Sequence, residues 1–203
     1  LVVLMLTSAW AQERATSSKF DVTWGGKKVA TLSLSQSCPK QGKLGLKFAA
    51  KSSGVIDQIH AFDLKFRSLV STDFAGTRYL ETHIVEKGVP RKFQSVRESN
   101  GLRVKKRYKG KESVTLARVP GDTQDFVSWL FKLGRETLKP KSSYTYYMWD
   151  GWKLTRLDAD VMSPGSIYIP ARDEAVGALR VKVYRTVVST HDPKTVLRER
   201  ERL

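Results

Sequence analysis

The stretch Gly101-Leu-Arg-Val-Lys-Lys-Arg-Tyr-Lys-Gly-Lys-Glu112 decides the fold class. Up to Tyr108, its apolar and charged side chains largely alternate with a period of two, as in a strand with one buried face. Lys109-Gly110 then forms a tight turn, in which glycine supplies the positive φ that such a hairpin requires. A two-residue turn at this point places Arg107 opposite Glu112, which is a favourable cross-strand pair. The stretch therefore predicts an antiparallel β-hairpin.

The same period of two recurs along most of the chain. The segment from Phe20 to Trp24 alternates in this way before a turn at Gly25-Gly26, and two more hairpin turns are expected at Asn100-Gly101 and Asp150-Gly151. The other strands are expected at about residues 29–34, 44–48, 59–71, 78–87, 91–98, 102–108, 111–118, 144–149, 152–154 and 178–188.

One segment breaks the β pattern. From Thr123 to Leu133 the large apolar residues fall on one helical stripe, which predicts a helix near 123–134. Asp122 or Thr123 can cap its start, and Gly134 ends it. We therefore expect a mainly β fold, a single antiparallel and strongly curved sheet of about ten strands with this helix packed across it. The sheet is expected to form a half-barrel or open barrel, and a closed barrel fits the same pattern.

Composition limits the classes of protein to which the chain can belong. In 203 residues, 36 Lys and Arg oppose 20 Asp and Glu, which gives a net charge of +16, and 40% of the residues are hydrophobic. This apolar share suffices for a globular core, so a wholly disordered chain is excluded. The single cysteine, Cys38, excludes internal disulfides and cysteine-ligated metal clusters. We expect one β-rich domain over residues 12–189.

The two ends of the chain differ from this domain. Leu1 to Ala11 form a short apolar run ending in Ala-x-Ala, which is typical of a secretory signal peptide cleaved between Ala11 and Gln12. A buried first strand is the alternative, whereas a membrane anchor is not expected because a bilayer requires about 20 residues. No later run suits a transmembrane segment. Residues 190–203 form a polar, charge-alternating tail, and the sequence is expected to be truncated there.

No catalytic or metal-binding constellation is found in the sequence. The histidines are His60, His83 and His191, and none has the spacing from another that a zinc site needs. A Gly-x-Ser-x-Gly elbow and a phosphate-binding loop are absent, and Cys38 has no histidine near it in the sequence. We therefore expect a non-enzymatic protein without cofactor or metal. An enzyme assembled from dispersed acids and histidines is the alternative.

The candidate binding site is a run of positive charge. Residues 88–118 contain ten basic and two acidic side chains, a net charge of +8. On a strand, Arg103, Lys105 and Arg107 share one face, and Val104 and Tyr108 lie on the other. The cations predicted to bind an anionic ligand are Arg91, Lys92, Arg97, Arg103, Lys105, Lys106, Arg107, Lys109 and Lys111. A solvated face, or a strand edge protected against aggregation, is an equally good interpretation.

A basic stripe of this kind fits several partners. For an exported protein these are lipopolysaccharide phosphates, anionic phospholipid headgroups and cell-wall polymers, and the apolar face of a curved sheet can also hold an acyl chain. We therefore expect a periplasmic or secreted binding protein of the cell envelope, whose partner is an anionic lipid or polymer. An envelope scaffold or assembly factor that binds another protein through its sheet edges is the first alternative.

Nucleic-acid binding through the stripe is the second alternative. It is disfavoured because export removes a protein from most nucleic acid. Phosphate contacts would also be expected together with stacking aromatics. Core and hairpin packing explain the tryptophans better than base stacking does, namely Trp24, Trp129, Trp149 and Trp152.

Several short motifs occur in a recognisable order along the chain. They are Phe20-Asp-Val-Thr-Trp-Gly-Gly26, Ala50-Lys-Ser-Ser-Gly-Val-Ile-Asp57, Gln124-Asp-Phe-Val-Ser-Trp-Leu-Phe131, Leu138-Lys-Pro140, Asp150-Gly151 and Val176-Gly-Ala-Leu-Arg-Val181. In this order the chain resembles the bacterial family called domain of unknown function 3108, a group of secreted or periplasmic envelope proteins. The resemblance covers most of residues 19–188.

The chain departs from the family's pattern at three points. Phe126 stands in place of the family's proline, Lys141 in place of a glycine, and the family's closing hairpin is missing. The resemblance implies a curved antiparallel sheet, similar in outline to periplasmic lipid-handling half-barrels. It implies no reaction and no catalytic residue.

Overall fold

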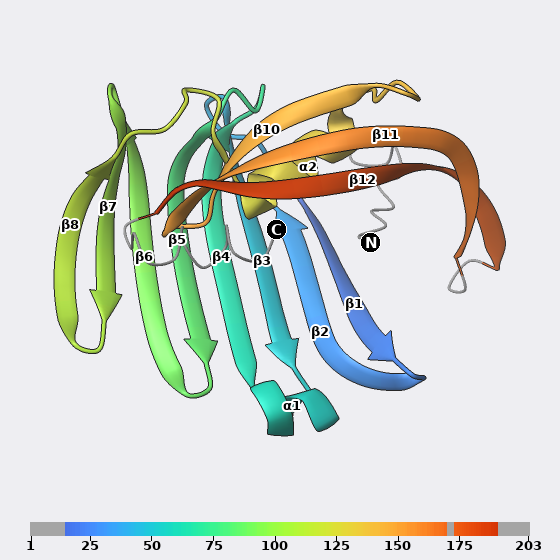
Figure 1. Cartoon of the computed structure of the whole chain (residues 1–203), viewed down its shortest axis with the longest axis horizontal. Helices are drawn as coiled ribbons and strands as arrows, with labels where there is room; N and C mark the ends of the chain where they lie inside the picture. The colour runs from blue at the N-terminus through green and yellow to red at the C-terminus, as the bar shows by residue number, and fades with distance from the viewer. Residues whose placement is uncertain (1–14, 170–172, 191–203) are drawn as a thin grey trace.

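The computed structural model describes residues 15–169 and 173–190 (Figure 1). The described chain is mainly β, as predicted, but its strands form two sheets, so the expectation of a single sheet is wrong. The predicted cleavage point between Ala11 and Gln12 lies outside the described residues, as does the predicted tail from residue 191 onward.

The first sheet contains eight strands in the order of the chain. Neighbouring strands are antiparallel, and the sheet has free edges at its first and last strands, so it is an open sheet. The strands are β1 (Thr16–Trp24), β2 (Lys27–Gln36), β3 (Lys43–Ser52), β4 (Phe62–Ser71), β5 (Thr77–Glu86), β6 (Val89–Glu98), β7 (Gly101–Tyr108) and β8 (Lys111–Ala117).

Two of the predicted hairpin details can be compared with this sheet. Lys109 and Gly110 both have positive φ, at 49° and 74°, and Arg107 pairs with Glu112, so the hairpin of β7 and β8 is confirmed. The turn predicted at Asn100-Gly101 is shifted by one residue, because Gly101 already pairs with Glu98. Gly101 is needed there because a Cβ would lie 2.3 Å from the carbonyl oxygen of Ala117.

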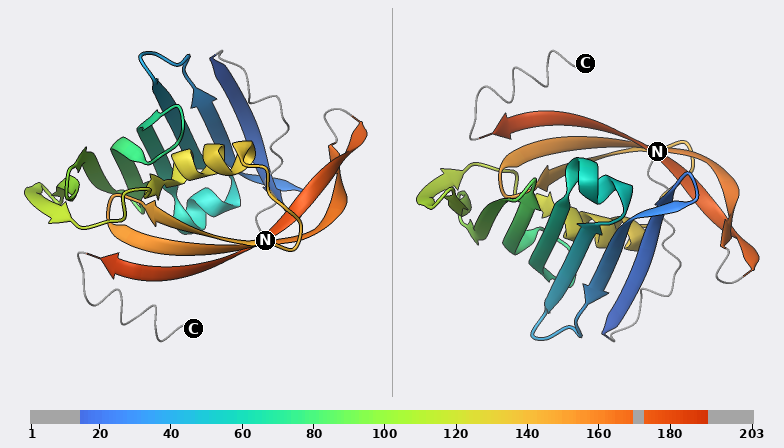
Figure 2. Two further views of the ribbon diagram at one scale, coloured as in Figure 1. Left: turned by 90° about the horizontal axis from the view of Figure 1, so that it is seen from above. Right: turned by 90° about the horizontal axis from the view of Figure 1, so that it is seen from below.

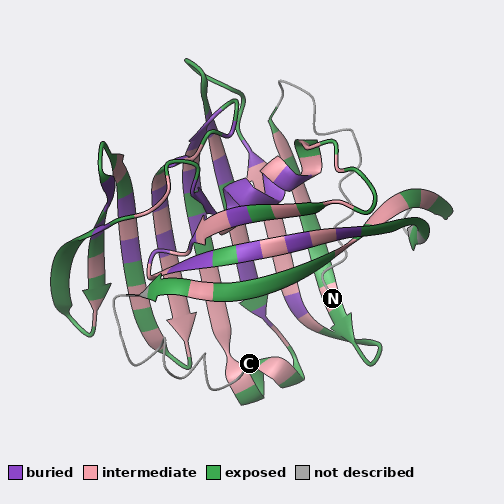
Figure 3. Cartoon of the chain, turned by 45° about the horizontal axis from the view of Figure 1, so that its top comes forward, coloured by how far each residue is buried: buried purple, intermediate pink, exposed green. Residues whose placement is uncertain are grey.

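A short helix, α1 (Val55–His60), separates β3 from β4. The strand predicted from about residue 59 therefore begins later, at Phe62. None of the residues of α1 is buried, and its apolar positions Val55, Ile56 and Ile59 share one helical face. The helix forms at the end of the sheet, beyond the region that the second sheet covers (Figure 3).

The second sheet has the strand order β12-β11-β10-β9. Its elements are β9 (Gln124–Asp125), β10 (Ser143–Trp149), β11 (Lys153–Ile169) and β12 (Glu174–Thr190). The long hairpin of β11 and β12 curls at its far end (Figure 1). The hairpin predicted at Asp150-Gly151 is confirmed, and Oδ1 of Asp150 accepts hydrogen bonds from the amides of Trp152 and Lys153, both at 2.7 Å.

The predicted helix is α2 (Phe126–Arg135), which lies between the two sheets (Figure 2). It starts later than expected because Gln124 and Asp125 pair with β10 as strand β9. Its cap is therefore Asp125, in a capping box with Ser128, and neither Asp122 nor Thr123 caps it. The helix also continues through Gly134, which was predicted to end it.

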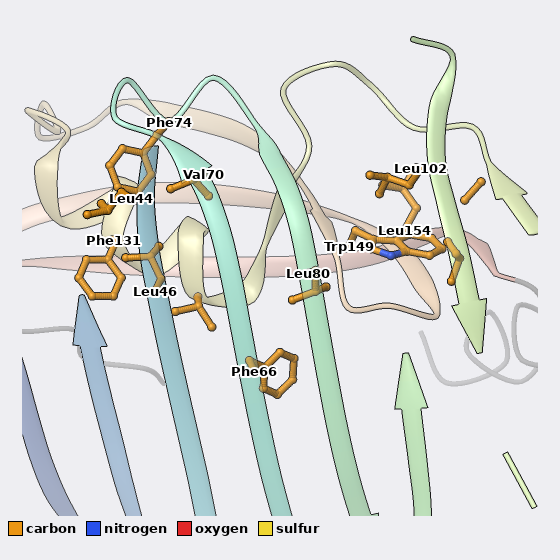
Figure 4. Close-up of a cluster of buried hydrophobic side chains, with 13 residues drawn as sticks. Leu44, Leu46, Phe66, Val70, Phe74, Leu80, Leu102, Phe131, Trp149 and Leu154 are labelled. Carbon is orange, nitrogen blue, oxygen red and sulfur yellow. The ribbon is translucent and has the colours of Figure 1, made fainter. Parts of the chain in front are cut away.

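Helix α2 contributes to two hydrophobic clusters, one toward each sheet. On the side of the first sheet, Val127 and Phe131 pack with Leu44, Val70 and other buried residues (Figure 4). On the side of the second sheet, residues of α2 pack with β10 and β11, namely Trp129, Leu130, Leu133, Tyr146, Leu157 and Ala159. The layers are thus sheet, helix and sheet.

A buried hydrogen-bond network fixes the start of α2 against the first sheet. Asp125 is fully buried, and its Oδ2 accepts hydrogen bonds from the hydroxyls of Ser68, Thr77 and Ser128 at 2.5, 2.7 and 2.9 Å. Its Oδ1 accepts from the amides of Val127 and Ser128 at 2.8 and 3.0 Å. The carboxylate is therefore a cap and a tether to β4 and β5, and solvent cannot reach it.

Within the described residues, neither helix is long and apolar enough to cross a membrane.

Candidate functional site

The nine predicted anion-binding cations do not share one surface. Lys92, Arg103, Lys105 and Arg107 lie on the outer face of the first sheet, because each pairs across the strands with another outward residue. Arg91, Arg97 and Lys106 lie on the opposite face, which is the side of α2 and the second sheet. Lys109 and Lys111 belong to the turn and strand start between β7 and β8. Arg103, Lys105 and Arg107 do share a face opposite Val104 and Tyr108, as predicted.

Most of the outer cations have an acidic partner. Nζ of Lys92 lies 2.6 Å from Glu81, Nε of Arg103 lies 2.9 Å from Glu98, and Nζ of Lys105 lies 3.0 Å from Glu112. The hydrogen bond from Lys92 lowers the pKa of Glu81, so this carboxylate stays charged opposite it. The outer stripe is therefore partly neutralised.

Arg107 differs from these three cations. Although it pairs with Glu112 in the strand register, Glu112 makes its ion pair with Lys105. Arg107 is exposed and forms no ion pair with any residue that the structure describes. The positive charge that is left over thus lies toward the β7–β8 turn.

Arg97 has a structural role. Its Nε, Nη1 and Nη2 donate to the carbonyl oxygens of Thr77, Pro120 and Thr123 at 3.2, 3.2 and 3.0 Å. Burial of the guanidinium lowers the pKa of Arg97, as expected for a charge removed from water. The side chain joins the connection before α2 to β5, and we exclude it from the candidate site.

The other two inward cations lie against aromatic rings. Nζ of Lys106 lies 3.4 Å from the ring centroid of Trp152, and Cζ of Arg91 lies 5.7 Å from that of Tyr108. Arg91 also approaches Glu86 at 3.3 Å. These contacts are cation–π interactions that stabilise the inner face of β6 and β7.

The structure adds a feature that the basic stripe does not indicate, a cavity of about 720 Å³ between α2 and the second sheet. Its lining is mostly aliphatic and aromatic, and it includes Trp129 and Leu133 of α2, Leu157 of β11 and Leu179, Val181 and Val183 of β12. Pockets for small ligands and cofactors usually measure about 300–1,000 Å³ and are mostly apolar. The size and lining therefore suit an organic ligand with an apolar body.

Few polar groups accompany this lining. Trp129 is 6% exposed, and its Nε1 has no hydrogen-bond partner among the described residues. Arg185 contributes one positive charge to the lining, and Glu136 accepts a hydrogen bond from the hydroxyl of Tyr146 at 2.5 Å. Burial and this hydrogen bond raise the pKa of Tyr146, so the phenol stays protonated. The site thus combines a mostly apolar cavity with one acidic and one basic side chain in its lining, Glu136 and Arg185.

Two glycines leave part of the cavity wall without side chains. Gly165 and Gly177 line the cavity, and a Cβ placed on either would meet no heavy atom within 4 Å. Gly177 has the same parity along β12 as Leu179, Val181 and Val183, so its missing side chain would point to the same face. The space at this wall therefore depends on the absence of side chains, which hydrophobic periodicity cannot reveal.

Two further features bear on chemistry. His60 contacts Glu86 at 2.9 Å, and Cys38 is an exposed free thiol. In the part of the chain that the structure describes, no three His, Cys, Asp or Glu side chains lie close enough together to hold a metal ion.

Comparisons with family models, with curated proteins and with solved structures found no match to this chain. The resemblance to the domain of unknown function 3108 family thus stays a prediction from the motifs quoted above. The function has to be argued from the cavity and the charged surfaces.

Proposed function

We propose that the protein is a non-enzymatic binding protein of the cell envelope, and that its ligand is an anionic amphiphile such as a lipid. The observation that carries this proposal is the cavity between α2 and β12, with its volume of about 720 Å³. An acyl chain offers no hydrogen bonds and gains free energy when its surface leaves water, so an aliphatic wall is its natural binding site.

The few polar groups of the cavity support an amphiphile over a plain hydrocarbon. Glu136 and Arg185 both line the cavity, and Glu136 is engaged within the fold, since it accepts a hydrogen bond from Tyr146 at 2.5 Å and lies 3.8 Å from Lys132. The guanidinium of Arg185 is exposed, and such a group can form charge-assisted hydrogen bonds with an anionic headgroup.

The charge of the whole chain supports an anionic partner. The net charge is +16, and Arg107, Lys109 and Lys111 keep exposed charges without an ion pair among the described residues. Such a protein is attracted to anionic surfaces before any specific contact forms. The signal-like segment before Gln12 and the family resemblance support a partner in the periplasm or outside the cell.

A titration with cis-parinaric acid, a fluorescent fatty acid, tests the cavity. After removal of any bound lipid, the protein should bind the probe saturably at one site. Gly177→Leu places an apolar side chain in the cavity and should weaken binding about tenfold or more. Gly121→Leu is the matched control, because its Cβ also meets no heavy atom within 4 Å but lies outside the cavity lining. Equal binding by Gly177→Leu and the original chain would overturn the proposal.

A second function, an assembly factor that binds another envelope protein, is favoured by the edge strand β8. Val114 and Leu116 are 61% and 47% exposed there, and no strand of the described residues pairs with the outer edge of β8. A partner strand could add to such an edge through main-chain hydrogen bonds. Val114→Lys with Leu116→Lys should then abolish a stoichiometric protein complex and leave the binding of parinaric acid unchanged.

A further inference from the structure

The four loops at one end of the first sheet form a common surface. Because β1 to β8 follow one another in an antiparallel meander, the connections β1–β2, β3–β4, β5–β6 and β7–β8 lie at the same end (Figure 1). We call this surface the hairpin end, and it comprises residues 24–27, 53–61, 87–88 and 109–111. Helix α1 belongs to it.

The hairpin end exposes large apolar side chains. Trp24 is 75% exposed, Ile59 is 70% exposed and Val55 is 50% exposed. The expectation that Trp24 packs into the core or its hairpin is thus wrong. The three residues belong to adjacent connections, since the segment before α1 bonds to β2, with the amide of Ser53 2.9 Å from the carbonyl oxygen of Val29.

The apolar face of α1 is only partly covered by the described chain. The helix contacts β2 and β3, and Ile56 is half-buried, but Val55 and Ile59 of the same face stay exposed. An amphipathic helix usually turns such a face toward a core. Here two of its three apolar side chains remain in contact with solvent.

Most of the charges without an ion pair at the hairpin end are positive. Its exposed lysines without an ion pair to any described residue are Lys27, Lys87, Lys109 and Lys111. Of the acidic residues near them, Glu86 is ion-paired within the fold, whereas Asp57 is hydrogen-bonded but has no ion pair among the described residues. Glu86 contacts His60 and Arg91 at 2.9 and 3.3 Å, and Asp57 accepts a hydrogen bond from Ser52.

The opposite end of the same sheet provides a contrast. Its connections are residues 37–42, 72–76 and 99–100, and all of them lie in the described part of the chain. None of the exposed large hydrophobic residues of the described chain lies in these three connections. Of the two ends of this sheet, only the hairpin end thus combines exposed large apolar side chains with exposed lysines in its described connections.

We propose that the hairpin end docks onto an anionic lipid bilayer. Trp24, Val55 and Ile59 enter the boundary between headgroups and acyl chains, where tryptophan is favoured and apolar surface leaves water. Lys27, Lys87, Lys109 and Lys111 contact the anionic headgroups around them. Apolar anchors and a polybasic rim are the two signals that together give stable peripheral binding.

This proposal goes beyond the proposed function, which concerns the cavity, although the choice of a bilayer as the partner rests on the proposed envelope location. The test is flotation of the purified protein with vesicles of phosphatidylglycerol and phosphatidylcholine in equal amounts, and with vesicles of phosphatidylcholine alone. The unchanged chain should float with the mixed vesicles and much less with the neutral ones, and high salt should weaken its binding.

Variants at the hairpin end separate the contribution of the apolar side chains to vesicle binding from that of the lysines. Trp24→Ser with Ile59→Ser should weaken binding to the mixed vesicles at least about tenfold, because exposed side chains that would enter the bilayer are removed. Replacing the four lysines by glutamine should weaken it by a similar factor and remove most of its dependence on salt. All six positions are exposed, so both variants should keep the original Tm.

Val114→Ser with Leu116→Ser is the matched control, since these residues are 61% and 47% exposed but lie on β8. The control should bind vesicles as the unchanged chain does. Unchanged binding by either hairpin-end variant, or an equal loss in the control, would overturn the proposal.

Parinaric acid binding by the same variants should be unaffected. Vesicle binding without any parinaric acid binding would therefore remove the proposed function and leave the docking surface intact.

Discussion

The two sides of helix α2 are built in opposite ways. Toward the first sheet, Val127 and Phe131 are 0% and 2% exposed and pack into a continuous core, and Asp125 is held by five hydrogen bonds. Toward the second sheet, Trp129 and Leu133 border a cavity of about 720 Å³, and the indole donor has no partner. The helix is therefore fixed on one side and leaves space on the other.

This difference assigns separate roles to the two sheets. Protein interiors are normally packed without voids larger than a water molecule, so a large apolar space beside a closely packed core indicates a binding site. The first sheet acts as the rigid base that holds α2 in place. The long hairpin of β11 and β12 forms the far wall, and a ligand can enter without disturbing the base.

The largest expected effect comes from removing the tether on the packed side. Asp125→Ala leaves three buried hydroxyls and two helix amides without their acceptor and should lower the free energy of unfolding by about 3–5 kcal/mol. Asp122→Ala is the control, because Asp122 is exposed and lies in the same connection. It should change stability by less than about 0.5 kcal/mol.

Urea denaturation followed by circular dichroism measures both variants. If Asp125→Ala lowers stability no more than Asp122→Ala does, the network does not fix the helix. If Asp125→Ala does not fold, Ser68→Ala and Thr77→Ala each remove one of the hydrogen bonds and should each cost about 1 kcal/mol.

A pair of equal truncations compares the two sides directly. Leu44→Ala on the packed side should cost about 3–5 kcal/mol, because it opens a new cavity in a closed core. Leu133→Ala removes the same atoms beside an existing space and should cost about 1 kcal/mol less. If both variants lose the same free energy of unfolding in urea denaturation, the cavity is closed in solution.

The smallest expected effect is a pH dependence of stability at the connection between β10 and β11. Burial raises the pKa of Asp150 above its ordinary value of 3.8, which means that its charged form is penalised in the folded state. Asp150→Asn keeps an acceptor for the amides of Trp152 and Lys153 and removes that charge.

The sign follows from linkage. A carboxyl group whose pKa is raised in the folded state binds its proton more tightly there than in the unfolded state. In the original chain, the cost of burying the charge of Asp150 is therefore lost as the pH falls through the folded-state pKa toward 3.8. The variant should therefore be at least as stable as the original chain at pH 7. Its advantage should shrink toward pH 4, as thermal unfolding at both pH values would measure. An advantage that grows on acidification would contradict the account.

Local patterns in the sequence predicted much of the fold. Alternation located most of the strands, and the glycine turns at Lys109-Gly110 and Asp150-Gly151 located two hairpins, of which the first also has the predicted pairing of Arg107 with Glu112. The helix was located by its apolar stripe, but its start was displaced because Gln124 and Asp125 pair with β10. That pairing is non-local, and propensity along the chain cannot show it.

The division into two sheets and the position of the candidate site also depend on non-local contacts, so they were harder to predict. Nothing in the alternation of residues 143–190 distinguishes strands that extend the first sheet from strands that cross over α2. The basic stripe was visible as charge density, but the acidic partner of Lys92 is Glu81 of a neighbouring strand, β5. The cavity wall at Gly177 consists of missing side chains, which carry no hydrophobic signal.

The central claim is that the space beside α2 holds an acyl chain. Mass spectrometry of an organic extract tests it most directly, with the protein produced in a bacterial periplasm and purified through a high-salt wash. The account predicts about one lipid molecule for each chain, and its loss in Gly177→Leu but not in Gly121→Leu. An extract without lipid from the original chain, or equal lipid from Gly177→Leu, would contradict it.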